Sequence, residues 1–286
     1  MIGVGVTQDL AQTGHRVILI DVADEILARA ERLIAKNVRF HHMLKPSSER
    51  QDVARVLQRI RFSTDYGLLA DAEFVIENVR EDWDLKRSVY RRLDDICGPR
   101  CIFAANTSAI PITRIGSVTR RAALVLGMHF MNPVPLKPVV EVIRGRQTSD
   151  ETIDSARALL AQMDKEAIVV HDSPGFVSNR VLMVTINEGV SLLHEEVATV
   201  EAIDRIFREC FAHQMGPLET ADLIGLDTVL YTLQVLHDAF QDGKYKPCPR
   251  LISMVDSGLL GRKSGQGFYK YRIEGDPPQA GKSRDQ

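Results

Sequence analysis

Short apolar runs rich in β-branched residues alternate with helix-like segments through the first half of the chain. Val17–Asp21 and Phe74–Glu77 are almost wholly apolar, which is typical of parallel strands covered on both faces. Segments 24–35 and 84–96 have helical periodicity. Strands that alternate with helices predict an α/β fold with a doubly wound parallel sheet. The predicted strands are residues 17–21, 74–77, 101–106, 124–129, 139–143 and 167–170.

The pattern changes after Asp172-Ser173-Pro174-Gly175, beyond which helix signals continue to about Phe240. We therefore expect a Rossmann-like domain over residues 1–172 and an all-α domain over residues 173–273. Segment 176–193 is apolar nearly all round, which indicates a helix buried in its domain or at a subunit contact. Residues 274–286 are rich in Gly, Pro, Lys and Asp and predict a disordered tail.

Composition excludes several classes of protein. The chain has 286 residues, 44% of them hydrophobic and 26% charged, as in a globular protein of one or two domains. The net charge of −2 argues against a nucleic-acid surface. We see no membrane span and no signal peptide, so a cytoplasmic protein is expected. The spacing of Cys97 and Cys101 does not match paired zinc ligands, so no metal site is expected.

The amino end carries part of a dinucleotide-binding pattern. Gly3 fits the third glycine of a G-x-G-x-x-G loop, and Asp21 ends the next strand 18 positions later, where a carboxylate binds an adenosine ribose hydroxyl. That carboxylate would repel a 2′-phosphate, which favours NAD over NADP. The first strand and the first two glycines would lie upstream of Met1. Either the sequence begins too late, or the protein has lost this strand and binds NAD poorly.

Four polar residues lie in distinctive local phrases: Ser108, His129, Glu141 and Asn179. They provide a hydroxyl, an imidazole, a carboxylate and an amide, which suffice to take a proton from an alcohol while a hydride leaves its carbon. Each also has a structural interpretation. A histidine at a strand end often only packs, Ser108 could cap a turn, and Asn179 could be an ordinary helix residue. Glu141 lies within an apolar run, and a buried carboxylate needs a partner.

Five sequence motifs resemble those of the L-3-hydroxyacyl-CoA dehydrogenases, including the 3-hydroxybutyryl-CoA dehydrogenases. They are residues 106–113, 127–145, 172–180, 215–228 and 261–269. The resemblance runs from Gly3 to about Tyr271. It implies that His129 is the general base for the 3-hydroxyl of an acyl thioester and that Glu141 orients the imidazole. It further implies that Ser108 and Asn179 bind the substrate's oxygens.

The same resemblance implies NAD as cofactor. Glu81 and Lys86 match positions that contact the nicotinamide half of NAD. Gly3, Asp21 and Asn106 are also expected to bind the cofactor. The helical domain would bind substrate and pair two subunits, so a homodimer is expected. The predicted partners are therefore an acyl-CoA or acyl-carrier-protein thioester and a second copy, with no nucleic acid and no membrane.

Alternatives remain open at this point. Segment 37–46 has only Arg39 and Lys45 as reliable cations, fewer than a CoA site suggests, and it carries Phe40, Met43 and Leu44, which suit a protein partner. This resembles relatives that act on hydroxyacyl or glyceryl groups tethered to acyl carrier protein in the synthesis of polyketide extender units. A non-catalytic assembly subunit without NAD is the alternative of another class. A dehydrogenase of free hydroxy acids or polyols is the third.

Overall fold

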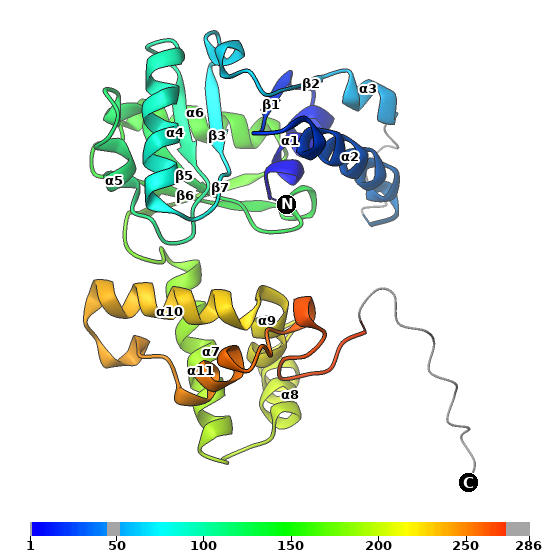
Figure 1. Ribbon diagram of the computed structural model, residues 1–286, viewed down its shortest axis with the longest axis vertical. Coiled ribbons are helices and arrows are strands. Elements are labelled where there is room, and N and C mark those ends of the chain that lie inside the picture. Colours follow the sequence, from blue (N-terminus) through cyan, green and yellow to red (C-terminus); the bar gives the residue numbers. More distant parts are fainter. Residues whose placement is uncertain (1, 45–51, 273–286) are drawn as a thin grey trace. The chain divides into compact units, whose positions relative to one another are not determined.

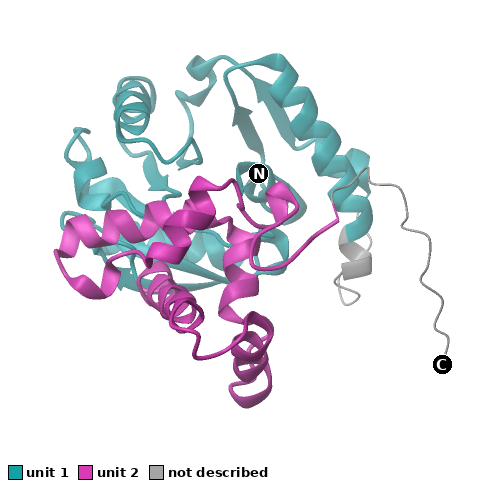
Figure 2. Cartoon of the chain, turned by 60° about the horizontal axis from the view of Figure 1, so that its bottom comes forward, with its two compact units in different colours: residues 1–176 teal, residues 177–286 magenta. Residues whose placement is uncertain are grey.

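The computed structural model describes residues 2–44 and 52–272, with the side chains of residues 41–44 left out, and the chain divides into two compact units. Unit 1 is Met1–Phe176 and unit 2 is Val177–Gln286 (Figures 1 and 2). The predicted tail, residues 274–286, lies outside the described residues. No helix of the described part is long and apolar enough to cross a membrane.

The described residues of unit 1 form two sheets. A two-stranded sheet pairs its strands in parallel, and a five-stranded sheet has its strands in sequence order (Figure 1). The strands are β1 (Val17–Ile20) and β2 (Ile60–Ser63) in the first sheet, and β3 (Phe74–Glu77), β4 (Ile102–Ala105), β5 (Val125–His129), β6 (Val139–Arg144) and β7 (Glu166–His171) in the second.

Helices cover both faces of the five-stranded sheet, since Figure 1 shows α4 in front of it and α6 behind it. Alternate residues of β4 and β5 enter the two cores: Phe103 and Val125 pack with α4, whereas Ala104 and Leu126 pack with α6. The Asp82 carboxylate caps α4 by accepting from the Leu85 N–H at 2.8 Å. The helices of unit 1 are α1 (Ile2–Gln12), α2 (Asp24–Leu44), α3 (Val53–Leu57), α4 (Trp83–Ile96), α5 (Ile112–Gly116) and α6 (Asp150–Gln162).

The observed sheet differs from the predicted one in two strands. β6 runs antiparallel to β5, because the connection of residues 130–138 is shorter than the dozen or so residues that a parallel crossover needs. β2 was not among the predicted strands, because Arg61 and Ser63 interrupt its apolar run. The α/β fold with a largely parallel sheet and the helical second part are confirmed.

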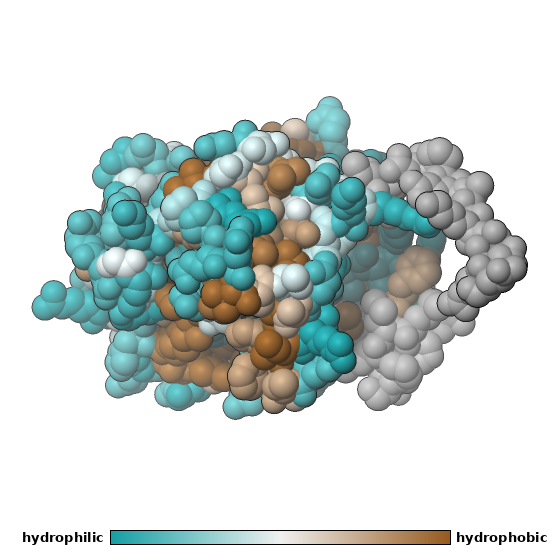
Figure 3. All heavy atoms as spheres, turned by 90° about the horizontal axis from the view of Figure 1, so that it is seen from below, coloured by the Kyte–Doolittle hydropathy of each residue, from teal (hydrophilic) through white to brown (hydrophobic). Residues whose placement is uncertain are grey.

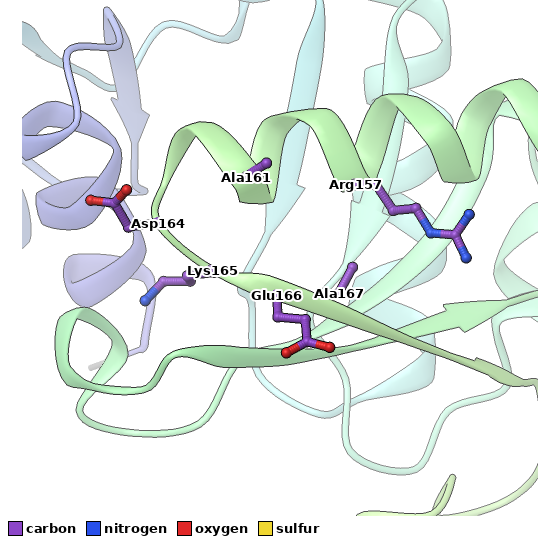
Figure 4. A pocket seen from close by; sticks show the side chains of 6 residues that line it. All are labelled: Arg157, Ala161, Asp164, Lys165, Glu166 and Ala167. Atoms are coloured by element: carbon purple, nitrogen blue, oxygen red, sulfur yellow. The ribbon is translucent and has the colours of Figure 1, made fainter.

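A buried lysine fixes α1 against the rest of unit 1. The Lys165 ammonium lies 3.0 Å from the Asp9 carboxylate of α1, and it donates to the carbonyls of Val134 at 2.8 Å and Lys137 at 2.7 Å. Figure 4 shows its side chain leaving the turn before β7 toward α1. The pocket drawn there is lined by this lysine and five neighbours, none of which is an expected site residue. Lys165 thus positions the amino-terminal helix.

Unit 2 is a helical bundle. Its core is formed by apolar residues of mutually packed helices, among them Met183, Ile186 and Leu233. The segment of its first helix was predicted to be apolar nearly all round and buried in its domain or at a subunit contact. Met183 and Ile186 of this helix are buried, whereas Val181 is 62% exposed. The helices are α7 (Ser178–His194), α8 (Val200–Cys210), α9 (Pro217–Ile224), α10 (Leu226–Phe240) and α11 (Pro249–Asp256).

Asp94 joins the end of α4 to the segment that leads into β5. Its carboxylate accepts from the backbone N–H and the Nε of Arg120, at 2.9 and 2.8 Å, and from the Nε of Arg121 at 2.6 Å. Burial tends to raise the pKa of Asp94, but these hydrogen bonds outweigh it, and the pKa lies below its usual value of 3.8. The carboxylate therefore stabilises the fold in its ionised form.

We expect Asp94→Asn to lower the free energy of unfolding at pH 7 by about 1–3 kcal/mol, because it weakens charge-assisted hydrogen bonds at a buried site. A lowered folded-state pKa gives stability that is present above the unfolded pKa and is lost as pH falls through the folded value. The substitution should therefore also flatten the loss of stability below about pH 4. Urea unfolding across pH 3–7 measures both effects.

The matched control is Asp95→Asn, since the Asp95 side chain is 74% exposed and its bond to Arg120 lies at the surface. Its effect should stay below about 1 kcal/mol. An equal loss of stability in the two variants would contradict the role given to Asp94.

Candidate functional site

His129 and Glu141 face each other across the antiparallel pair of strands. His129 is the last residue of β5 and is in register with Glu141 of β6, so both side chains leave the same face of the sheet. The His129 Nδ1 lies 3.0 Å from the Glu141 Oε2. Both residues are buried, at 6% and 9% exposure, and the Phe176 ring packs edge-on against the imidazole. The surroundings thus fix the ring's position and orientation.

The other ring nitrogen faces Ser108. The Ser108 Oγ lies 3.3 Å from the His129 Nε2. Because the carboxylate accepts an N–H at Nδ1, Nε2 can carry the lone pair that takes a proton. The carboxylate also stabilises the imidazolium that results. The arrangement can therefore perform general acid–base chemistry at a position beside Ser108.

The Glu81 carboxylate holds the turn that carries Ser108. Its Oε1 accepts from the Thr107 hydroxyl at 2.5 Å and from three consecutive backbone N–H groups, of Ser108 at 3.1 Å, Ala109 at 2.9 Å and Ile110 at 3.2 Å. Successive N–H groups that converge on one oxygen form an anion-binding nest, here filled by the chain's own carboxylate. Glu81 thereby positions Ser108 relative to His129.

Lys86 lies next to this turn but has no exposed surface. Its ammonium donates to both oxygens of Glu77, at 2.9 and 2.8 Å, and to the Asn106 carbonyl at 3.2 Å. Burial raises the pKa of Glu77, and the neighbouring Lys86 charge offsets part of that rise. Since Glu77 ends β3 and Asn106 follows β4, Lys86 ties together the carboxyl ends of two strands.

Asn106 extends this network toward both His129 and α1. Its Nδ2 donates to the Asn78 Oδ1 at 2.8 Å, and its Oδ1 accepts from the Phe130 N–H at 3.2 Å. Gly3, in the first turn of α1, packs so closely on Asn78 that an added Cβ would lie 3.2 Å from the Asn78 Cβ. The amino end of α1 therefore lies beside the carboxyl end of β3.

The structure brings most of the predicted site residues together in unit 1: Ser108, His129, Glu141, Glu81, Lys86, Asn106 and Gly3. Asp21 directly follows β1, where its carboxylate accepts from the Val22 N–H at 2.7 Å. Asn179 lies in unit 2, in the first turn of α7, so its contact with substrate stays a prediction. Sequence reasoning missed Glu77 and Asn78, although an acidic residue ending the apolar run Phe74–Glu77 was a usable signal.

Comparison with known proteins shows a family that spans both units. Residues 1–173 match the family model "3-hydroxyacyl-CoA dehydrogenase, NAD binding domain", and residues 175–271 match "3-hydroxyacyl-CoA dehydrogenase, C-terminal domain". The chain is 45% identical over 269 residues to a probable 3-hydroxybutyryl-CoA dehydrogenase of Deinococcus radiodurans, covering 94% of this chain and 96% of that protein.

Other relatives carry the same enzyme name. A 3-hydroxybutyryl-CoA dehydrogenase of Bradyrhizobium diazoefficiens is 41% identical over 270 residues, covering 94% of this chain and 92% of that one. The crystal structure of (S)-3-hydroxybutyryl-CoA dehydrogenase from Ralstonia eutropha superposes with a TM-score of 0.90 at 41% identity and covers 95% of both chains. The resemblance inferred from the sequence phrases is confirmed.

We expect Glu141→Gln to lower kcat about 10²- to 10⁴-fold, because a neutral amide neither stabilises the imidazolium nor selects the same tautomer of His129. KM should change little. Steady-state kinetics measure the effect, and circular dichroism checks the fold. Glu166→Gln, at the exposed start of β7, is the matched control. An unchanged kcat in Glu141→Gln would refute the pairing's role.

Glu81→Ala should lower kcat/KM by about 10- to 100-fold, because the turn that carries Ser108 loses its acceptor and shifts relative to His129. Glu81→Gln keeps an oxygen acceptor and should recover much of the activity. Equal losses in the two variants would show that the charge of Glu81, rather than its hold on the turn, is what matters. Unchanged activity in both would exclude either role.

Proposed function

Because the chain belongs to the 3-hydroxyacyl-CoA dehydrogenase family, it is an NAD-dependent oxidoreductase, and we propose that its Ser108–His129–Glu141 arrangement oxidises the 3-hydroxyl of an L-3-hydroxyacyl-CoA. The observation that carries this proposal is the geometry at His129. The Glu141 carboxylate hydrogen-bonds to the ring nitrogen Nδ1, and the other ring nitrogen, Nε2, faces the hydroxyl of Ser108.

His129 acts as the general base in this proposal. Its Nε2 takes the proton of the substrate's 3-hydroxyl, and the Glu141 carboxylate stabilises the imidazolium that forms. The Ser108 hydroxyl hydrogen-bonds the substrate's oxygen and holds the alcohol within reach of Nε2. NAD, when bound, supplies the acceptor for the hydride that leaves the carbon bearing the 3-hydroxyl. In the reverse direction the imidazolium returns the proton to the alkoxide oxygen.

The residues present fit NAD at two points. Asp21 directly follows β1, next to α1, where a carboxylate suits an adenosine ribose. The close packing of Gly3 on Asn78 is what the third glycine of a nucleotide loop provides. We assign the nicotinamide end to the carboxyl ends of β3 and β4, beside Asn106 and Glu81. Because Lys86 is buried, we assign it an indirect part in NAD binding, in which it positions Glu77 and Asn106.

We assign to unit 2 the substrate contact of Asn179 and the pairing of two subunits. The second assignment is supported by apolar side chains that remain exposed on packed helices: Val181 of α7 at 62%, Leu223 of α9 at 52% and Tyr231 of α10 at 49%. Figure 3 shows apolar side chains gathered on the face viewed there. The four cysteines are free thiols, which supports a reducing, cytoplasmic location: Cys97, Cys101, Cys210 and Cys248.

CoA is the thioester carrier that we propose, since the relatives described above carry 3-hydroxybutyryl-CoA dehydrogenase names. The expectation of a carrier-protein contact rested on segment 37–46. Phe40 is 48% exposed on α2, whereas the side chains of Met43 and Leu44 and the whole of Lys45 lie outside the described residues. An intact His129–Glu141 pair supports an enzyme over a non-catalytic subunit.

We expect the wild type to form NADH from L-3-hydroxybutyryl-CoA and His129→Gln to lower kcat by about 10²- to 10⁴-fold with an unchanged fold. Absorbance at the NADH band measures the rate. The same assay with a carrier-bound hydroxybutyryl group and with the free acid compares the three substrate classes. A higher kcat/KM for the carrier-bound group than for the CoA thioester would identify acyl carrier protein, and not CoA, as the thioester carrier. Full activity of His129→Gln would refute the mechanism.

A further inference from the structure

The first turn of α7 carries the predicted substrate residue Asn179. The N–H groups of a helix's first turn have no acceptors within the helix, and a polar side chain at the N-cap usually accepts from them. In α7 the N-cap residue is Val177, whose apolar side chain cannot accept a hydrogen bond. The position of Asn179 therefore depends on what else holds this turn.

The Arg180 side chain attaches the same turn to two aromatic rings. Its Nε donates to the Tyr245 hydroxyl at 2.8 Å, and its guanidinium carbon lies 4.2 Å from the centroid of the Phe240 ring. The two rings also pack on each other, with their centroids 5.2 Å apart. The contact with Phe240 and the hydrogen bond to Tyr245 together fix the position and the direction of the guanidinium. We call Arg180, Phe240 and Tyr245 the arginine clamp.

Both rings of the arginine clamp are held by the core of unit 2. Phe240 is the last residue of α10, which crosses α7 in the bundle (Figure 1). Tyr245 ends the short 3₁₀ helix η4 (Gly243–Tyr245) and is 1% exposed. It belongs to the main apolar cluster of unit 2, against which Phe240 packs. The arginine clamp therefore connects the first turn of α7 to the buried core of the bundle.

The segment that follows α10 holds α7 at a second place. The Asn187 Nδ2 donates to the Lys246 carbonyl at 3.0 Å, and the Asn187 Oδ1 accepts from the Cys248 N–H at 2.9 Å. Arg180 and Asn187 are seven residues, or about two helical turns, apart and so lie on one face of α7. Asn187 thus fixes the middle of the helix, whereas the arginine clamp fixes its amino end.

We propose that Arg180 is a positioning residue for the substrate, acting through Asn179. This role rests on the proposed function, which assigns the substrate contact to Asn179. Because Asn179 directly precedes Arg180, holding Arg180 fixes the backbone from which the Asn179 amide extends. Without the arginine clamp the first turn of α7 loosens, and the amide must then bind the thioester from a less ordered backbone, which weakens binding. The NAD contacts assigned to unit 1 stay intact.

Arg180→Met tests this role, because methionine keeps an extended side chain but has neither the charge nor the donors of arginine. We expect kcat/KM for L-3-hydroxybutyryl-CoA to fall about 10- to 100-fold, mainly through a higher KM. The Kd for NAD, measured by isothermal titration calorimetry, should be unchanged. A merely structural role would lower the melting temperature and leave the KM of the folded protein unchanged.

Further variants separate the two contacts of the arginine clamp. Arg180→Lys keeps a cation that can lie over Phe240 and donate to Tyr245, so it should recover part of the loss. Tyr245→Phe removes only the hydroxyl and should raise KM less than Arg180→Met does. Arg205→Met is the matched control, since the Arg205 side chain of α8 is 71% exposed, and it should behave like the wild type.

Hydrogen exchange gives a readout that needs no catalysis. We expect the amides of residues 181–184 to exchange at least about tenfold faster in Arg180→Met than in the wild type, whereas those of residues 188–192, beyond the Asn187 contact, should be unchanged. A wild type without turnover would refute the proposed function, and the exchange data would still decide whether the arginine clamp holds the turn. If Arg180→Met does not fold, Tyr245→Phe decides, with the same expected directions.

The proposal is overturned if folded Arg180→Met has the KM of the wild type, if Arg205→Met raises KM equally, or if exchange at residues 181–184 is unchanged. It is also overturned if Arg180→Lys recovers nothing and Tyr245→Phe has no effect on KM, because neither contact of the arginine clamp would then matter to the substrate.

Discussion

The antiparallel pairing of β5 with β6 is the constraint on which the site depends. It places His129 directly opposite Glu141, and a shift of one residue would turn one of the two side chains to the opposite face. The short connection after His129 imposes this direction. Because both residues are buried, their interaction is little screened by water, and the imidazole keeps one orientation.

Buried and partly buried charges organise the strand ends around this pair. Lys86 joins the ends of β3 and β4, Glu81 holds the turn with Ser108, and Lys165 holds α1 and the segment after Pro133. Burying such groups costs free energy that their partners must offset, and each ammonium here has several acceptors. The result is a set of rigid supports behind the residues to which we assign the proposed proton transfer.

Much of the fold and of the site could be predicted from local sequence. Apolar β-branched runs located β1, β3, β4, β5, β6 and β7, since burial on both faces leaves a continuous apolar signature. β2 was not predicted, because Arg61 interrupts its apolar run. His129, Glu141 and Ser108 were predicted from their phrases, and the structure brings them within hydrogen-bonding distance. Glu81 was predicted as a cofactor residue, but its hold on residues 107–110 depends on a fold that joins separate segments.

The sequence by itself determined most of the strands, their order and the types of side chain at the candidate site, because strand and helix periodicity and residue type are local properties. Only the tertiary structure decided the burial of Lys86 and the nest around Glu81. These depend on which distant segments become neighbours, and the local periodicity of one segment does not specify its distant neighbours.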